Sequence, residues 1–341
     1  MIRKTRKEAA FVAWVKYFRR SELLAEQLNA KLHFVQYGRE GMLIAAPIRY
    51  VLQALKTCKI LAEEMPETVL VQNPPIFLAL IAFLYGRLCG ARFIIDSHTS
   101  AFLSPRWTWS LWLHRMLSRR ALITLVHNES QEQTVKRWRC PYAVVGDPIT
   151  DYPRGRPYPV AGQFNVAVVC SFQPDEPIRT MLEGAARLPD VDFYFTGDPV
   201  GLPRPVLEKR PTNCHLTGYL PYPHYIGLLR CSDVVMSLIT SDHTLLCGAF
   251  EAVSLGVPLI VSDWPILKAR FSAGTVHVPN TVEGIQQGVR RAMRHQDTLR
   301  REIRLLRKEL RTEWQQNLEM LQALIEDGST SGRGHVISLE R

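Results

Sequence analysis

The chain has 341 residues, of which 46% are hydrophobic and 22% are charged, a composition that excludes disordered and fibrous proteins. The length favours two domains of roughly 150 residues each. The formal net charge of +10 favours anionic partners such as nucleotide diphosphates, nucleic acid or anionic lipid.

Strand and helix patterns alternate along the first half of the chain, which predicts a parallel sheet with helices on both faces. The predicted strands are 9–15, 32–38, 68–72, 91–98, 121–128 and 142–148. The predicted helices are 20–28, 48–65 and 76–89, with two more that begin near residues 109 and 129.

A segment rich in Pro and Gly, residues 147–163, reads as an interdomain linker. The alternation then resumes, with strands at 164–171, 191–197, 213–220, 233–239, 258–263 and 275–279 and helices at 178–188, 222–231, 247–255 and 281–295. Two doubly wound halves are expected to bind their ligand at the carboxyl ends of the strands.

We therefore predict an N-terminal domain over 1–150 and a C-terminal domain over 151–296. A helix over 297–326 carries an apolar stripe that requires a packing partner, and residues 327–341 read as a flexible tail.

No segment has the features of a membrane span or a disulfide framework. The longest apolar run, 76–86, is about half the roughly 20 residues that a transmembrane helix needs. The basic N-terminus is a poor signal peptide, and the seven cysteines form no C-x-x-C pair, so we expect neither zinc nor disulfides. These observations predict a cytoplasmic protein.

Asp96 and His98 follow a buried predicted strand in "DSHTSAF". Because they are two residues apart, they share a face if the strand geometry continues. A carboxylate and an imidazole there can accept a proton from a hydroxyl group. The equally weighted alternative is that Asp96 caps the next segment and His98 is only polar lining.

Arg179 lies in the predicted first turn of the helix at 178–188. A helix N-terminus suits a phosphate group, and a cation placed there favours an anionic ligand, although exposed arginines also occur in first turns without one. The sequence contains neither a G-x-G-x-x-G fingerprint nor a P-loop, which argues against ordinary dinucleotide binding and P-loop hydrolysis.

The segment 104–120 interleaves tryptophans with arginines, among them Trp109, Trp112 and Arg115. This combination suits either a membrane interface or stacked bases, and we expect an anionic membrane or acceptor surface here. Tryptophans packed in a core beside solvated arginines are the alternative. No nucleic-acid module is recognised, so we expect no nucleic-acid partner.

The stretch "DHTLLCGAFEAVSLGVPLIVSD", residues 242–263, resembles the donor-binding segment of GT-B glycosyltransferases of the family 4 type. The resemblance implies two doubly wound Rossmann-like domains facing a cleft, with Glu251 on the ribose of a nucleotide sugar. His243 stands where the family usually has a second glutamate.

Further segments, "VLVQNPP", "FIIDSH" and "SFQPDEP", are similar to the β-1,4-mannosyltransferases of the dolichol pathway. The resemblance implies that Ser171, Arg179, Thr240 and Ser241 lie at the donor. It also places Arg20 and Ser21 in a phosphate-side loop of the N-terminal domain.

Taken together, these features predict a glycosyltransferase that moves a sugar from a nucleotide-sugar donor to a lipid-linked or polysaccharide acceptor at the inner membrane face. It would need no metal and no cofactor, with Asp96 or His98 as the base. A nucleotide-sugar 2-epimerase of the same fold and a catalytically silent scaffold are the alternatives. The resemblances leave open whether the anomeric configuration is retained or inverted.

Overall fold

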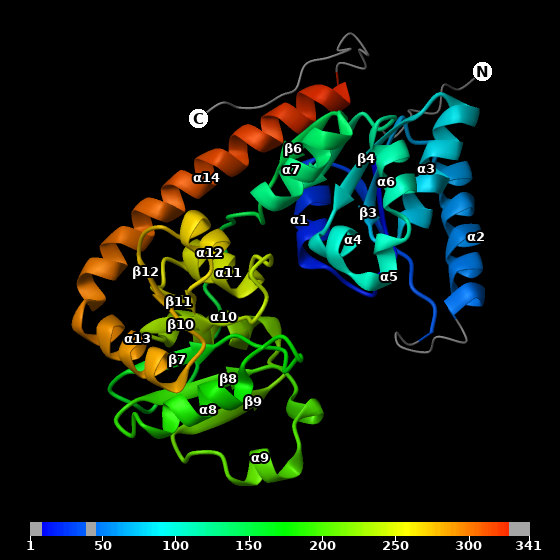
Figure 1. Cartoon of the computed structure of the whole chain (residues 1–341). Coiled ribbons are helices and arrows are strands. Elements are labelled where there is room, and N and C mark those ends of the chain that lie inside the picture. The colour runs from blue at the N-terminus through cyan, green and yellow to red at the C-terminus, as the bar shows by residue number, and fades with distance from the viewer. Residues whose placement is uncertain (1–8, 39–45, 327–341) are drawn as a thin grey trace. The chain divides into compact units, whose positions relative to one another are not determined.

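The computed structural model describes residues 9–38 and 46–326, so the predicted tail 327–341 lies outside the described residues. The chain divides into two compact units, Met1–Pro148 with Trp314–Arg341 and Ile149–Glu313 (Figure 1). They are called the first and the second unit below.

The first unit contains a six-stranded sheet in the order β2-β1-β3-β4-β5-β6, and its neighbouring strands pair in parallel. The strands are β1 Ala9–Ala13, β2 Lys31–Phe34, β3 Thr68–Asn73, β4 Arg92–Ser97, β5 Ile123–Val126 and β6 Tyr142–Val144. The helices are α1 Arg19–Gln27, α2 Ala46–Glu64, α3 Ile76–Cys89, α4 Thr99–Leu103, α5 Pro105–Thr108, α6 Leu111–Ser118 and α7 Glu129–Trp138.

The second unit repeats this plan with the order β12-β11-β10-β7-β8-β9, again with parallel pairs. Its strands are β7 Asn165–Val168, β8 Asp192–Thr196, β9 Cys214–Gly218, β10 Val234–Ser237, β11 Leu259–Ser262 and β12 Thr275–Val278. Its helices are α8 Ile178–Ala186, the 3-10 turn η1 Pro199–Gly201, α9 Arg204–Glu208, α10 Tyr222–Cys231, α11 Cys247–Leu255, α12 Pro265–Arg270 and α13 Val282–Arg294, followed by α14 Gln296–Glu326.

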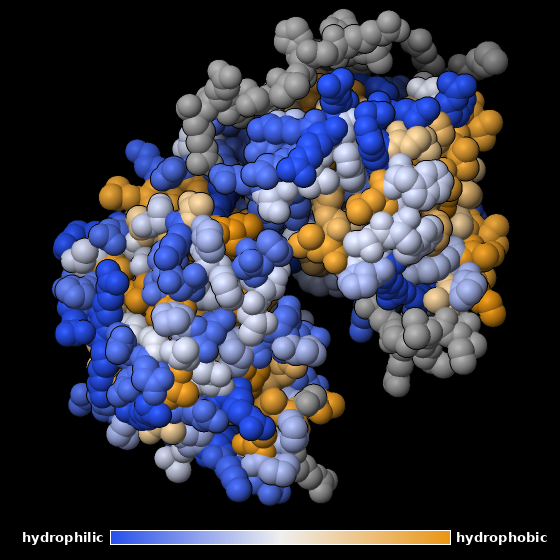
Figure 2. All heavy atoms as spheres, in the orientation of Figure 1, coloured by the Kyte–Doolittle hydropathy of each residue, from blue (hydrophilic) through white to orange (hydrophobic). Residues whose placement is uncertain are grey.

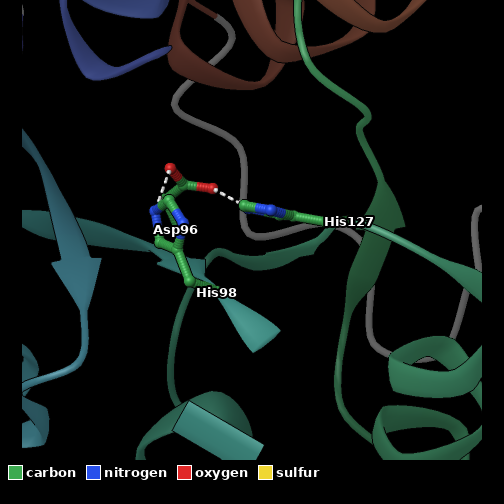
Figure 3. Close-up of side chains that lie close together, drawn as sticks. All are labelled: Asp96, His98 and His127. Atoms are coloured by element: carbon green, nitrogen blue, oxygen red, sulfur yellow. Dashed lines mark hydrogen bonds and ion pairs between the residues drawn. The ribbon is translucent and has the colours of Figure 1, made fainter. Parts of the chain in front are cut away.

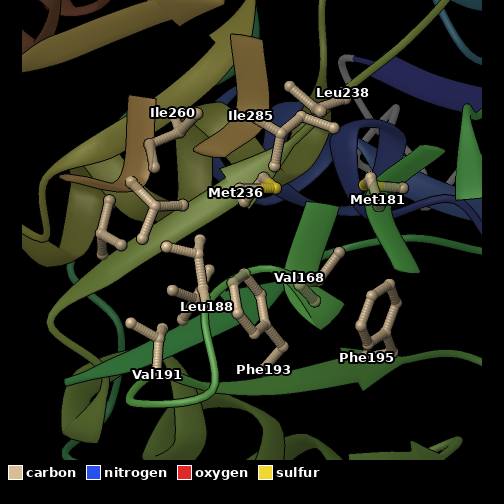
Figure 4. Packing of buried hydrophobic residues seen from close by; sticks show 14 of the residues in the cluster. Val168, Met181, Leu188, Val191, Phe193, Phe195, Met236, Leu238, Ile260 and Ile285 are labelled. Carbon is tan, nitrogen blue, oxygen red and sulfur yellow. The ribbon is translucent and has the colours of Figure 1, made fainter. Parts of the chain in front are cut away.

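The central strands of each sheet are continuous apolar runs buried on both faces, whereas the edge strands β2, β9 and β12 are partly exposed. In the second unit one face packs on α8 and α13 around residues such as Phe193, Phe195 and Met236 (Figure 4). The opposite face packs on α10 and α11. The prediction of two doubly wound α/β domains is confirmed.

Helix α14 contributes to the cores of both units. Ile303, Leu306 and Leu310 belong to an apolar cluster of the second unit, whereas Trp314 and Leu321 belong to one of the first unit. Within the first unit the Trp314 indole also donates to Gln27 Oε1 at 2.6 Å. The apolar stripe read from the sequence therefore packs along the length of this helix.

Candidate functional site

The carboxyl ends of β4 and β5 bring together Asp96, His98 and His127 (Figure 3). Asp96 is fully buried. His98 Nε2 lies 3.4 Å from Asp96 Oδ2, and His127 Nε2 lies 3.2 Å from Asp96 Oδ1. The centroids of the two imidazole rings lie 4.4 Å apart, edge to face. One carboxylate thus contacts both histidines.

Arg20 contacts this cluster from α1. Its Nη2 lies 3.2 Å from Asp96 Oδ1, and its Nη1 lies 3.1 Å from Asp147 Oδ1. Arg20 and Ser21, which were predicted in a phosphate-side loop, are both buried in the first turn of α1, and their phosphate-side role stays a prediction. Arg20 is held there by two carboxylates of its own unit.

The charges around Asp96 fix its protonation state. Burial alone would raise its pKa, but Arg20, His98 and His127 together hold the pKa of Asp96 well below its usual range. Burial, aided by the positive charge of Arg20, lowers the pKa of His127 to about 4. At neutral pH the cluster therefore contains a carboxylate and an uncharged His127, so Asp96 accepts hydrogen bonds and is a weak base.

The three side chains offer ligand atoms within 4.8 Å of one another, a geometry that a metal ion can use. Arg20 Nε and Nη2, however, contact both oxygens of Asp96 at 3.3 and 3.2 Å. A cation bound to this carboxylate would lie beside the guanidinium charge. The donor set therefore fits a hydrogen-bonded cluster better than a metal site.

Sequence reasoning missed His127. The signal was present, because His127 follows a buried strand in "ALITLVHN" as Asp96 follows one in "FIID". Since β4 and β5 are neighbours in parallel register, the residues that follow them meet at the same edge of the sheet. Applying that rule to both strands would have predicted the cluster.

In the second unit, two loops meet at the carboxyl ends of the neighbouring strands β7 and β10. The backbone N–H and the hydroxyl of Thr240 both donate to the Asp175 carbonyl, at 2.7 and 3.0 Å. Ser241 Oγ accepts from Thr244 at 3.2 Å. The predicted donor residues Ser171, Thr240 and Ser241 thus come from adjoining loops.

The Glu176 carboxylate accepts hydrogen bonds from the loop that follows β7. It accepts from the backbone N–H groups of Ser171 and Gln173, at 2.9 and 2.8 Å, and from the Ser171 hydroxyl at 3.2 Å. Phe172, between them, has a left-handed φ of 57°. Sequence reasoning did not single out Glu176, and Ser171 uses its donors internally here.

Arg179 lies in the first turn of α8 as predicted, and its side chain is exposed. Among the described residues it has no hydrogen-bond or ion-pair partner. His243 is exposed and lies 2.8 Å from Asp242. Arg179 is therefore an accessible positive charge without an acidic partner among the described residues.

Glu251 lies on α11, where its partly buried carboxylate accepts a hydrogen bond from the Tyr225 hydroxyl of α10. Burial, and then the charge of Glu251, raise the pKa of Tyr225 well above its usual value, so this tyrosine remains a donor. This hydrogen bond orients the carboxylate of Glu251, which is the group predicted to bind the ribose. Its binding role stays a prediction.

Trp109 and Trp112 are 56% and 67% exposed, and Arg115 is exposed too. By contrast, Trp107 of the same segment is buried, as the packed-core alternative has it. The membrane or acceptor role of the exposed residues stays a prediction. None of the helices within the described ranges combines the length and apolar character needed to cross a bilayer.

Part of the chain matches a known family of proteins. Residues 174–321 match a family model described as "Glycosyl transferase-like". This segment includes the predicted donor residues from Arg179 to Glu251. A search of curated proteins found no match to the sequence.

Solved structures share the whole two-unit plan. Anabaena Alr3699/HepE in complex with UDP and glucose has a TM-score of 0.68 and 14% identity, over 92% of each chain. Sucrose-phosphate synthase from Thermosynechococcus elongatus has a TM-score of 0.70 and 12% identity, over 92% of this chain and 99% of that one. The chain has the GT-B glycosyltransferase fold.

The sequence match to the family model and the similarity in fold both agree with the prediction of a glycosyltransferase. The finer likeness to family 4 and to dolichol-pathway mannosyltransferases stays a prediction.

A putative UDP-N-acetylglucosamine 2-epimerase from Listeria monocytogenes is also similar, with a TM-score of 0.64 and 14% identity over 97% of this chain and all of that one. The fold alone therefore does not separate transfer from epimerisation.

Proposed function

We propose that the protein transfers a sugar from a nucleotide-sugar donor to a hydroxyl group of an acceptor. One observation carries this proposal. Exposed Arg179, without a partner among the described residues, lies in the first turn of α8, beside two joined loops at the carboxyl ends of β7 and β10. This group of residues falls within or beside the segment that matches the glycosyltransferase family model.

The donor diphosphate binds at Arg179 and the N-terminus of α8, because a guanidinium and free helix N–H groups both attract an anion. Glu251 accepts from the ribose hydroxyls. Thr240, Ser241 and His243 line the phosphate side. HepE is described with UDP and with UDP-glucose, so a UDP-sugar is the first donor to test.

His98 is the better candidate for the base. Asp96 is fully buried with a lowered pKa, whereas His98 retains some exposure. His98 takes the proton of the acceptor hydroxyl, whose oxygen bonds to the anomeric carbon as the bond to the diphosphate breaks. Asp96 stabilises the imidazolium that forms, and the nucleoside diphosphate leaves without a metal or another cofactor.

The acceptor is a lipid-linked sugar or a polysaccharide, presented to a peripherally bound enzyme on the cytoplasmic side of a membrane. Exposed Trp109, Trp112 and Arg115 of the first unit support this proposal. Tryptophan favours the membrane interface and arginine favours anionic headgroups.

Calorimetry with UDP tests the donor proposal. A ligand at a hundred times its dissociation constant adds about 2.7 kcal/mol to stability, so thermal shift provides a rapid first screen. We expect UDP to bind the wild type and to bind Arg179→Ala at least about tenfold more weakly. Arg137→Ala is the matched control, because Arg137 is also exposed and lies in the first unit.

No response to UDP, GDP, ADP or CMP would favour the silent scaffold. The 2-epimerase alternative, suggested by the similar Listeria structure, predicts that the donor reacts without any acceptor, giving its 2-epimer or, where water cleaves the sugar–phosphate bond, free sugar and the nucleoside diphosphate. Transfer predicts a product that appears only when acceptor is present.

A further inference from the structure

Helix α2 carries exposed apolar residues opposite a core-facing side on which polar Gln53 and Thr57 lie beside apolar Ile60 and Leu61. Gln53 and Thr57 point inward and are buried, whereas Ile48, Val51 and Leu55 are 67%, 57% and 63% exposed. An ordinary surface helix places its apolar stripe on the core. Here the spacing of three and four residues builds a stripe that faces outward.

Specific hydrogen bonds fix this orientation. Gln53 Nε2 donates to the Val35 carbonyl at 2.9 Å. Thr57 Oγ1 accepts from the Trp14 indole at 2.9 Å and donates to the Gln53 carbonyl at 2.8 Å. Rotating α2 to bury its stripe would break these bonds and leave buried polar groups unpaired, at a cost of about 1 to 3 kcal/mol each. The outward apolar face is therefore built into the fold.

The exposed apolar surface continues beyond α2. Leu84 and Leu88 of the neighbouring helix α3 are 50% and 86% exposed. Figure 2 shows hydrophobic surface along the edge of the first unit where Figure 1 places α2. We call the set of exposed residues the α2 patch; it consists of Ile48, Val51, Leu52, Leu55, Leu84 and Leu88. Contiguous apolar surface of this kind marks an interaction site.

Aromatic contacts connect the α2 patch to the exposed tryptophans. The Tyr50 ring of α2 lies 5.4 Å from Phe77, which lies 6.2 Å from Trp109. Arg106 donates to the Tyr50 hydroxyl at 2.9 Å. These contacts place Trp109 near the N-terminal part of α2.

Basic residues border the apolar stripe. Arg49 and Lys56 are seven residues apart, so they lie on the same flank of α2, and exposed Arg87 follows on α3. Long basic side chains beside an apolar face let the stripe enter a membrane while their charges stay at the headgroups. A protein partner would need an apolar groove bordered by acid, whereas an anionic bilayer supplies both features.

We infer that α2 seats the first unit on an anionic lipid bilayer, with the α2 patch in the interface and its basic flank on the headgroups. The inference rests on the proposed function only for the presentation of an acceptor at a membrane. It names α2, rather than the tryptophan segment alone, as the principal lipid-binding element.

Co-sedimentation with phosphatidylcholine vesicles, with and without phosphatidylglycerol, tests this inference on the full chain. We expect the wild type to bind the anionic vesicles and Val51→Ser/Leu55→Ser to lose at least about tenfold in affinity. The matched control is Val200→Ser/Leu305→Ser, which removes the same groups from positions that are 85% and 68% exposed in the second unit. This control should bind like the wild type.

Calorimetry with UDP separates the two proposals, because the vesicle assay needs neither donor nor acceptor. Wild type that binds UDP but no vesicles would overturn the lipid inference and leave the donor proposal standing. Wild type that binds vesicles but no UDP would overturn the donor proposal and leave the lipid inference standing. A dimer of wild type that Val51→Ser/Leu55→Ser makes monomeric, without vesicle binding, would assign the α2 patch to a second copy and overturn the lipid inference.

Discussion

The guanidinium of Arg20 lies against the carboxylate of Asp96, with Nη2 3.2 Å from Oδ1 and both side chains buried. The two residues are 76 positions apart in the sequence. Arg20 also contacts Asp147, so one buried cation compensates two carboxylates at the carboxyl edge of the first sheet. This pairing keeps Asp96 ionised and positions it between His98 and His127.

Replacing Arg20 with Leu is expected to lower the free energy of unfolding of the first unit by about 3 to 5 kcal/mol, because it leaves a buried charge without its partner. Urea denaturation followed by tryptophan fluorescence measures this change, since every tryptophan except Trp264 belongs to the first unit. Arg137→Leu is the control at an exposed position. An unchanged midpoint in Arg20→Leu would show that the pair contributes little.

Replacing His98 with Ala is expected to lower kcat at least about 100-fold, the usual contribution of a general base. The calorimetric Kd for UDP should stay unchanged, because His98 belongs to the first unit and the donor residues to the second. His33→Ala controls for loss of a histidine elsewhere in the first unit. Wild-type turnover in His98→Ala would move the base to another residue.

Replacing Glu251 with Ala is expected to weaken UDP binding about 10- to 100-fold, since a hydrogen bond to a charged group contributes about 1.5 to 3 kcal/mol. Tyr225→Phe keeps the carboxylate and removes only its orienting hydroxyl, so a smaller loss is expected. Calorimetry measures both variants. Equal UDP affinity in Glu251→Ala and wild type would remove Glu251 from the donor site.

Most of the strands were predictable because buried parallel strands are short apolar runs bounded by turn residues. The short helices α4, α5, α9 and α12 were missed, since a helix of four to six residues is too short for its periodicity to be recognised. The sequence also could not predict that Trp107 is buried while Trp109 and Trp112 are exposed, because tertiary packing decides which side of a short turn faces the core.

The candidate site was only partly predictable. Asp96 and His98 could be found from their place after a strand. The pairing of Arg20 with Asp96 depends on how α1 packs against β4, and one sequence does not show such long-range contacts. The internal binding of Glu176 to the Ser171 loop depends on the left-handed backbone at Phe172, for which the residue type gives no signal.

The buried imidazole of His114 predicts a pH dependence of stability. Its Nε2 lies 2.9 Å from Ser97 Oγ and 3.1 Å from Asn73 Nδ2, and burial lowers its pKa to about 3. An unfolded histidine titrates near 6.5, so below that pH the unfolded chain binds a proton that the folded chain excludes. Stability therefore falls as the pH falls from about 6.5 toward 3.

One excluded proton gives a slope of about 1.4 kcal/mol per pH unit, and His127, with its pKa lowered to about 4, adds a second over much of the same range. Replacing His114 with Gln should remove one of these contributions between pH 4.5 and 6. This range lies between the lowered pKa values of both folded histidines and the pKa of an unfolded histidine. Urea denaturation at several pH values, read by tryptophan fluorescence, gives the slope for each protein. Lower stability in His114→Gln with the wild-type slope would mean that His114 packs in the core without resisting protonation.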